Sequence, residues 1–121
     1  MTPRFAFETR PWGTFEVLLD EPCYKVKRLC VQPGQRLSLQ SHRHRSEHWV
    51  VVSGRPTIHL DGQTCELGYG ESVFVPAGMR HRVANHGAEP VVIMEVQIGE
   101  SFEETDIIRY EDDYRRHGAP A

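Results

Sequence analysis

Turn-forming residues recur through this sequence at intervals of about eight to twelve residues, and that spacing restricts the fold more than any other feature. Short segments rich in β-branched and aromatic residues lie between the turns, and Asp61-Gly62 is the strongest hairpin signal among them. Eight or nine short strands, with no amphipathic helix before the C-terminal end, predict an all-β sandwich or barrel. The predicted strands are residues 14–19, 24–31, 37–47, 49–52, 57–60, 64–67, 72–75, 81–85 and 90–97.

The two ends of the chain depart from this pattern. The residues up to Arg10 are mixed in character, and we expect them to lie as an arm on the domain or on a partner. Residues 103–116 begin with acidic side chains and end with basic ones before Gly118, which favours a short C-terminal helix.

Length and charge exclude several classes of protein. A chain of 121 residues can bury a core as one domain without disulfides, and its three cysteines show no CxxC spacing. The formal charge of −3 argues against a nucleic-acid binder, and the longest apolar runs are far shorter than the roughly 20 residues that span a bilayer. Because the N-terminus lacks the apolar segment of a secretory signal, we expect a single domain over residues 1–121 in the cytoplasm.

One face of the predicted strand at 37–47 is rich in imidazole. Alternation along an extended chain places Ser38, Gln40, His42 and His44 on one face and the two leucines on the other. Imidazole is the commonest metal ligand among protein side chains. This face therefore predicts a metal site, which needs further ligands from elsewhere in the chain.

Two spaced motifs contain such ligands. One segment resembles the second cupin motif at every defined position: Gly70-x5-Pro76-x-Gly78-x2-His81-x3-Asn85. The first cupin motif, Gly-x5-His-x-His-x3,4-Glu-x6-Gly, is similar to the segment with His42, Glu47 and Gly54, in which Gln40 stands where the first histidine belongs. The resemblance implies a cupin, a double-stranded β-helix of the jelly-roll type whose ligands face the barrel interior.

A closer resemblance covers nearly the whole chain. Segments in the same order from about residue 10 to residue 114 are similar to the type II mannose-6-phosphate isomerase domain, usually the C-terminal part of a bifunctional mannose-1-phosphate guanylyltransferase. The similar segments are 10–13 (RPWG), 24–29 (YKVKRL), 37–40 (LSLQ), 45–51 (RSEHWVV), 95–97 (EVQ) and 111–114 (EDDY). We expect the domain to stand alone here, because the 121 residues contain no glycine-rich nucleotide-binding half.

The resemblance also implies a metal-ligand set. Its expected members are Gln40, His42, Glu47 and His81. An amide oxygen, two imidazoles and one carboxylate leave a divalent ion positively charged with room for exchangeable oxygens, as a catalytic site requires. Larger phosphomannose isomerases bind zinc with such a set, so zinc is the expected metal, while manganese, cobalt or iron suit the same ligands. His44 is an alternative to Gln40, and His48 is expected to point away because it alternates with Glu47.

The activity that the resemblance implies is the interconversion of mannose 6-phosphate and fructose 6-phosphate. A proton would move between C1 and C2 through an enediol, with Glu95 as the expected base and Gln97 on the same strand face as a substrate ligand. Residues 106–109 resemble the Asp-x-Val-Val-Arg ending of the larger isomerases, which nominates Arg109 for the substrate oxygens.

The phosphate group of that substrate needs cationic ligands. We expect it to contact Ser38 and Arg45, with Lys27 or Arg28 as alternatives to the latter, since guanidinium groups suit phosphate. Residues 99–107 depart from the Gly-x-Tyr-x-Gly-Glu-Asp-Asp-Ile expected of the family, so the segment over the site lacks its tyrosine.

Two functions therefore remain open from the sequence. One is the sugar-phosphate isomerase, and the alternative is a non-catalytic metal-binding cupin that binds a sugar phosphate or sugar nucleotide. The expected partner is a small-molecule sugar phosphate rather than nucleic acid or membrane. A homodimer is expected from cupins generally.

Overall fold

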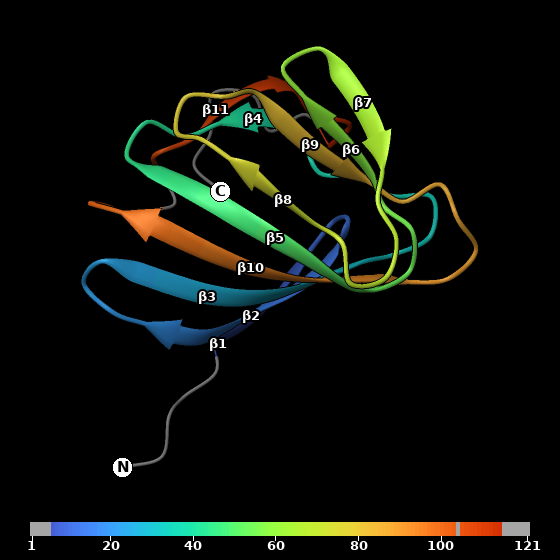
Figure 1. Cartoon of the computed structure of the whole chain (residues 1–121), viewed down its shortest axis with the longest axis horizontal. Helices are drawn as coiled ribbons and strands as arrows, with labels where there is room; N and C mark the ends of the chain where they lie inside the picture. Colours follow the sequence, from blue (N-terminus) through green and yellow to red (C-terminus); the bar gives the residue numbers. More distant parts are fainter. Residues whose placement is uncertain (1–5, 104, 115–121) are drawn as a thin grey trace.

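Residues 6–103 and 105–114, which the computed structural model describes, form two antiparallel β-sheets that face each other (Figure 1). The six-stranded sheet contains, in spatial order, β1 (Ala6–Arg10), β2 (Gly13–Asp20), β3 (Tyr24–Val31), β10 (Val91–Gly99), β5 (Arg45–Ser53) and β8 (Ser72–Val75). The five-stranded sheet contains β11 (Ile108–Glu111), β4 (Leu39–Ser41), β9 (His81–Ala84), β6 (Thr57–Leu60) and β7 (Gln63–Glu66). The all-β prediction is confirmed.

The local signals read from the sequence explain most strand boundaries. Asp61 and Gly62 have φ angles of 47° and 84°, the left-handed values that a two-residue turn needs to join β6 to β7. The predicted strand at 37–47 is divided, because only Leu39–Ser41 forms β4 and the chain turns before β5 begins at Arg45. β5 then continues through the apolar run 49–52 as a single strand.

The predicted C-terminal helix is wrong. Among residues 6–103 and 105–114 no helix is present, and Ile108–Glu111 instead forms β11, an edge strand that pairs with β4. The charges that suggested helix ends have partners across the fold: Arg36 binds Asp113 through two hydrogen bonds of 2.7 and 2.8 Å, and Arg82 binds Glu111 at 3.1 Å. Gly118, the predicted helix stop, lies outside the described residues. The described end of the predicted N-terminal arm, Ala6–Arg10, is strand β1 at the edge of the larger sheet.

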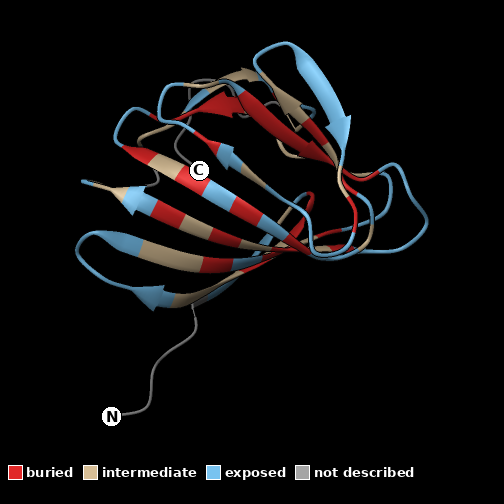
Figure 2. Cartoon of the chain, in the orientation of Figure 1, coloured by how far each residue is buried: buried red, intermediate tan, exposed pale blue. Residues whose placement is uncertain are grey.

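The inward-facing positions change from apolar to polar along the strands. On β10, Ile93 is followed by Glu95 and Gln97, and the register pairs Ile93 with Val51 and Gln97 with Glu47 on β5. Figure 2 shows that buried residues alternate with intermediate ones along β10 and with intermediate or exposed ones along β5. The apolar halves form the core, which contains Trp12, Phe15, Leu29, Val31, Trp49, Ile58, Val75, Val83, Val91 and Ile93. The polar ends of these strands line a separate part of the interior. Buried polar side chains are stable there only if they pair with one another or bind a ligand.

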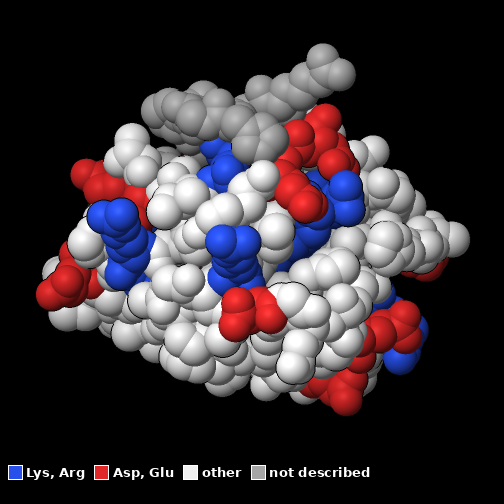
Figure 3. Space-filling view, turned by 90° about the horizontal axis from the view of Figure 1, so that it is seen from above, with Lys and Arg blue, Asp and Glu red and all other residues white. Residues whose placement is uncertain are grey.

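The surface shown in Figure 3 carries basic and acidic side chains that are interspersed. No extended basic patch of the kind that binds nucleic acid is visible on that face among the described residues. Within the described part of the chain, no helix is long and apolar enough to cross a membrane.

Candidate metal centre

The polar interior is a pocket, and all the predicted site residues line it except the two alternatives, His44 and Arg28. The six-stranded sheet contributes inward-facing residues at every second position, which is the period of an extended strand. Its predicted site residues are Lys27 on β3, Arg45 and Glu47 on β5, and Glu95 and Gln97 on β10. Their exposed fractions lie between 1% and 7%, so the larger sheet buries charge here rather than apolar side chains.

The five-stranded sheet supplies the opposite wall of the pocket. Gln40 on β4 pairs directly with His81 on β9 and with Arg109 on β11, so the three side chains stand on one face of this sheet. Ser38 and His42 flank β4 and are also buried pocket residues.

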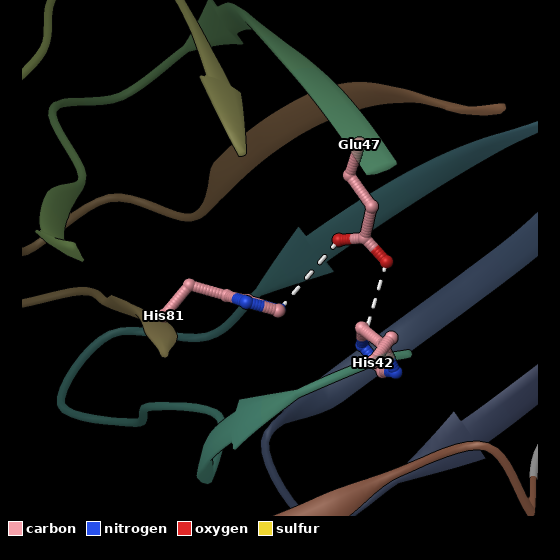
Figure 4. A group of neighbouring side chains, drawn as sticks. All are labelled: His42, Glu47 and His81. Atoms are coloured by element: carbon pink, nitrogen blue, oxygen red, sulfur yellow. Dashed lines mark ion pairs between the residues drawn. The ribbon is translucent and has the colours of Figure 1, made fainter. Parts of the chain in front are cut away.

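His42, Glu47 and His81 form a compact group of potential metal ligands (Figure 4). Glu47 points from β5 between the two imidazoles, with its carboxylate oxygens 3.4 Å from His42 Nε2 and 3.7 Å from His81 Nε2. Two ligand atoms that are each 2.0–2.1 Å from a tetrahedral zinc ion lie about 3.4 Å apart. The two His–Glu47 distances are close to this value and the three ligand atoms lie within 4.8 Å of one another, so the group could hold a small divalent cation.

Backbone carbonyl groups orient both histidines. His42 Nδ1 lies 2.7 Å from the carbonyl oxygen of Asp106, and His81 Nδ1 lies 3.0 Å from that of Met79. Because a carbonyl oxygen can only accept a hydrogen bond, the Nδ1 atom of each histidine carries the proton. The Nε2 atom of each ring then faces Glu47 with its lone pair. Metal-binding histidines are held in this way, with the second ring nitrogen donating to a carbonyl or carboxylate.

Gln40, rather than His44, lies with this group. Gln40 is 9% exposed and lines the pocket, whereas His44 is exposed and does not line it. His48 is likewise exposed and packs edge-on against Phe74 on the outer side of the sheet. The turn before β5 explains the difference, because it interrupts the alternation that would have carried His44 inward.

Two carboxyl groups, Glu47 and Glu95, share their hydrogen-bond donors. Trp49 Nε1 donates to both, at 3.2 and 3.0 Å, and Gln97 Nε2 donates to both, at 3.4 and 3.1 Å. Burial and the neighbouring charge of Glu47 raise the pKa of Glu95 to about 8. Burial also acts to raise the pKa of Glu47, but His81, His42 and other neighbours outweigh it and hold that pKa well below its usual range. The two carboxyl groups thus differ in protonation at neutral pH.

Arg45 and His42 complete the electrostatics of the group. Arg45 Nε donates to Glu47 at 3.0 Å, and its Nη2 lies 3.3 Å from His42 Nε2, which agrees with an unprotonated Nε2. Burial lowers the pKa of His42 to about 4, against the opposing effect of Glu47. A neutral imidazole beside an ionised carboxylate is the protonation state in which both residues bind metal.

The donors present fit a metal and its ligand. Arg45 Nη1 and Gln97 Oε1 are buried polar atoms without a hydrogen-bond partner among the described residues. Unpaired buried atoms are rare in folded proteins and point to a missing ion, water or ligand. One is a cationic donor and the other a neutral acceptor, so the pocket is suited to a ligand with both anionic and hydroxyl groups.

The structure corrects one alternative and adds three residues. Arg28 is exposed and bound to Glu16 at 2.7 Å, so it is not a pocket residue. Sequence reasoning missed Arg10, which lines the pocket above the Phe15 ring, although segment 10–13 had been recognised as a motif. Sequence reasoning also placed Trp49 only in the core, whereas its Nε1 atom donates to Glu47 and Glu95. It predicted no contact between Asp106 and the site, whereas the Asp106 carbonyl oxygen binds His42. The position of Trp49 two residues after Glu47 was a usable signal for its part in the site.

Curated relatives of this chain include enzymes and proteins of polysaccharide biosynthesis. The mannose-1-phosphate guanylyltransferase ManC of Salmonella typhimurium is 43% identical over 107 residues, which are 88% of this chain and 22% of the relative. The alginate biosynthesis protein AlgA of Pseudomonas aeruginosa is 45% identical over 112 residues, or 93% of this chain and 23% of the relative. The chain therefore spans about a fifth of the length of these relatives.

Solved structures agree with the jelly-roll architecture. A Klebsiella pneumoniae protein with a double-stranded β-helix domain superposes with a TM-score of 0.67 at 26% identity, over 71% of this chain and 76% of that one. The fold is thus the predicted double-stranded β-helix of the cupins. The family match, to the family described as mannose-6-phosphate isomerase C-terminal, runs from residue 4 to residue 112. On that match, the chain belongs to the mannose-6-phosphate isomerase C-terminal family.

Proposed function

We propose that this chain is a metal-dependent aldose–ketose isomerase that interconverts mannose 6-phosphate and fructose 6-phosphate through an enediol. The observation that carries the proposal is the pair of buried carboxyl groups, Glu47 and Glu95, whose pKa values are displaced in opposite directions. Glu47 stays ionised and can hold a cation. In the metal-free chain the pKa of Glu95 lies near neutral pH, and a cation beside Glu47 would lower it, so Glu95 can be ionised and accept a proton from a sugar carbon.

The proposed metal ligands are the predicted four, Gln40, His42, Glu47 and His81, with zinc as the first choice and manganese, cobalt or iron as alternatives. The spacing of the His42, Glu47 and His81 ligand atoms supports a small divalent ion. When bound, the metal would supply Lewis-acid polarisation of the sugar oxygens.

The remaining pocket residues bind and orient the substrate in this proposal. Glu95 removes the proton at one carbon and returns it at the next, while Gln97 Oε1 accepts a hydrogen bond from a sugar hydroxyl. Arg109 stands beside Gln40 across β11 and β4, so its guanidinium group is placed to bind sugar oxygens near the metal ligands. Each of these atoms faces the same pocket, which supports a common substrate.

The phosphate group is proposed to bind Ser38, Arg45 and Lys27. Lys27 packs over the Phe15 ring, 4.4 Å from its centroid, and the Arg10 guanidinium packs over the same ring at 4.9 Å. Lys27 thus brings a positive charge to the pocket beside Arg10, whose guanidinium group also pairs with Glu8 at 2.7 Å, and Arg45 Nη1 adds a hydrogen-bond donor.

The test is turnover with defined metals. The protein is stripped with chelator, zinc, manganese or cobalt is restored singly, and conversion of mannose 6-phosphate to fructose 6-phosphate is followed by NMR. Glu95→Gln should abolish turnover while sparing metal content. The matched control is Glu66→Gln, an exposed carboxyl that should behave as the unmodified protein.

The alternative function is a non-catalytic metal-binding cupin that binds a sugar phosphate or sugar nucleotide. A metal-loaded protein that binds mannose 6-phosphate and shows no turnover with any of the ions would establish this alternative and refute the isomerase. Retained turnover in Glu95→Gln would remove that residue as the base. Residence in the cytoplasm and assembly as a homodimer remain predictions.

A further inference from the structure

Asp106 makes three hydrogen bonds to the turn that carries a proposed metal ligand. Its carboxylate oxygens accept from the backbone N–H groups of Arg43 and His44, each at 3.0 Å. Its own carbonyl oxygen accepts from His42 Nδ1 at 2.7 Å. One residue, 62 to 64 positions later in the chain, therefore holds the backbone on one side of His42 and the imidazole ring itself.

The side-chain and main-chain contacts of Asp106 depend on each other. The carboxylate bonds fix where the Asp106 backbone lies relative to the 42–44 turn, and this placement sets the carbonyl oxygen at hydrogen-bond distance from the ring. The carbonyl bond then places the proton on Nδ1 and leaves Nε2 facing Glu47. Two other contacts also hold this segment, the 3.0 Å hydrogen bond from Asp106 N to the Glu103 carbonyl oxygen and the pairing of Ile108 with Ser41, but only the carboxylate bonds join Asp106 to the backbone of the 42–44 turn.

The same residue precedes the strand that carries Arg109. β11 begins two residues after Asp106, with Ile108 opposite Ser41 and Arg109 opposite Gln40. Tyr110 supports this register through a 2.9 Å hydrogen bond between its hydroxyl group and that of Ser41. The metal ligand His42 and the pocket residue Arg109 are thus attached to one short segment, 106–109.

We propose that Asp106 is a positioning residue of the metal centre, which holds His42 with Nε2 turned toward Glu47 and ties β11 to the ligand-bearing turn. The inference rests on the metal site of the proposed function and is independent of turnover. It gives Asp106 a role in metal affinity, although this residue is not among the proposed metal ligands.

The test measures metal binding rather than activity. Zinc affinity of the full chain is determined by competition with a chromophoric chelator, and the visible absorption of the Co²⁺ form reports the geometry around the ion. Outer-shell partners of metal-binding histidines typically change metal affinity by about 10–100-fold when mutated. Asp106→Ala, which loses both carboxylate bonds, should weaken zinc binding within that range and alter the Co²⁺ spectrum.

Two further variants separate positioning from general stability. Asp106→Asn keeps one acceptor oxygen and turns an NH2 group toward the other backbone N–H, so it should lie between Asp106→Ala and the unmodified protein. Asp113→Ala is the matched control, because Asp113 follows β11 and its carboxylate also makes two hydrogen bonds, here to Arg36, but Asp113 does not line the pocket. This control should retain full affinity and the unmodified spectrum.

Circular dichroism at each metal concentration identifies variants that fail to fold, and Asp106→Asn decides the question if Asp106→Ala is one of them. Folded Asp106 variants with unmodified zinc affinity and spectrum would overturn the proposal. An equal loss of affinity in Asp113→Ala would also overturn it, since the effect would then come from general destabilisation around β11. The isomerase proposal would survive either result, because it is judged by turnover.

Discussion

Replacing Glu95 with glutamine should stabilise the metal-free protein at neutral pH while it removes the proposed base. Glu95 is buried beside the ionised Glu47, and its pKa is raised from the ordinary value of 4.5 to about 8. Between these two pH values the folded state holds a proton that the unfolded state has lost. The free energy of unfolding therefore falls as pH rises through this window, and glutamine, which does not titrate, escapes the loss.

The size of the effect follows from the shift. One pKa unit corresponds to about 1.4 kcal/mol, so the interval from 4.5 to pH 7 gives an upper limit of about 3 kcal/mol. Against this, glutamine presents an NH2 group to one of the two donors that now bind Glu95, Trp49 Nε1 or Gln97 Nε2, and the lost hydrogen bond costs about 1 kcal/mol. We expect Glu95→Gln to raise the free energy of unfolding by about 1–2 kcal/mol at pH 7 and to lower it by about 1 kcal/mol near pH 4, where only the lost hydrogen bond remains.

Urea unfolding of chelator-treated protein across pH 4 to 8 measures this difference, with the slope m checked for constancy. Glu66→Gln is again the control, because its carboxylate is exposed and its variant should differ by less than about 0.5 kcal/mol at every pH. A Glu95→Gln variant that is less stable than the unmodified protein by the same amount at all pH values would refute the reasoning. Glu95 would then be ionised in the folded state, and its assignment as the base would lose its physical support.

Other perturbations probe the metal, the substrate, the fold and the assembly. Zinc at one hundred times its dissociation constant should stabilise the protein by about 2.7 kcal/mol in thermal unfolding, and His81→Ala should abolish this gain; a variant that keeps the gain would exclude His81 as a ligand. Arg109→Lys should raise KM for mannose 6-phosphate by about tenfold without loss of metal, because an ammonium group cannot bind two oxygens in a fork; an unchanged KM would place Arg109 outside the substrate contacts. Gly13→Ala should prevent folding, since a Cβ there would lie 1.9 Å from the Cys30 carbonyl oxygen at a φ of +152°, and a circular dichroism spectrum like that of the unmodified protein would contradict this. Light scattering should give twice the 13.9 kDa chain mass if the chain is a homodimer, and a single chain mass at all concentrations would contradict that expectation.

Features of the fold and site that depend on the spacing of neighbouring residues could be predicted from the sequence. Features that depend on contacts between distant parts of the chain could not. Alternation along β10 placed Glu95 and Gln97 on one inward face, and Asp61-Gly62 located a hairpin, because both are properties of a few consecutive residues. The 103–116 segment has the charge order of a helix, yet the contact of Arg36 with Asp113 spans 77 positions and no local pattern contains it. Asp106 was missed as a structural residue for the same reason, since its partners lie in a turn more than 60 positions earlier.

The charges in the pocket differ in sign from the charge of the whole chain, and this difference bears on the substrate class. The chain carries a formal charge of −3, whereas the pocket is lined by four cationic side chains, Arg10, Lys27, Arg45 and Arg109, and by two carboxyl groups. The raised pKa of Glu95 means that only Glu47 is ionised at neutral pH, and a divalent ion at the proposed ligands would make the pocket more positive still. Cationic side chains outnumber carboxyl groups at this pocket, even though Arg10 also pairs with Glu8 at 2.7 Å, so the pocket suits a ligand that brings negative charge with it. The phosphate of a sugar phosphate supplies two negative charges at one end, and its hydroxyl groups match the amide oxygen of Gln97 and the metal ligands at the other.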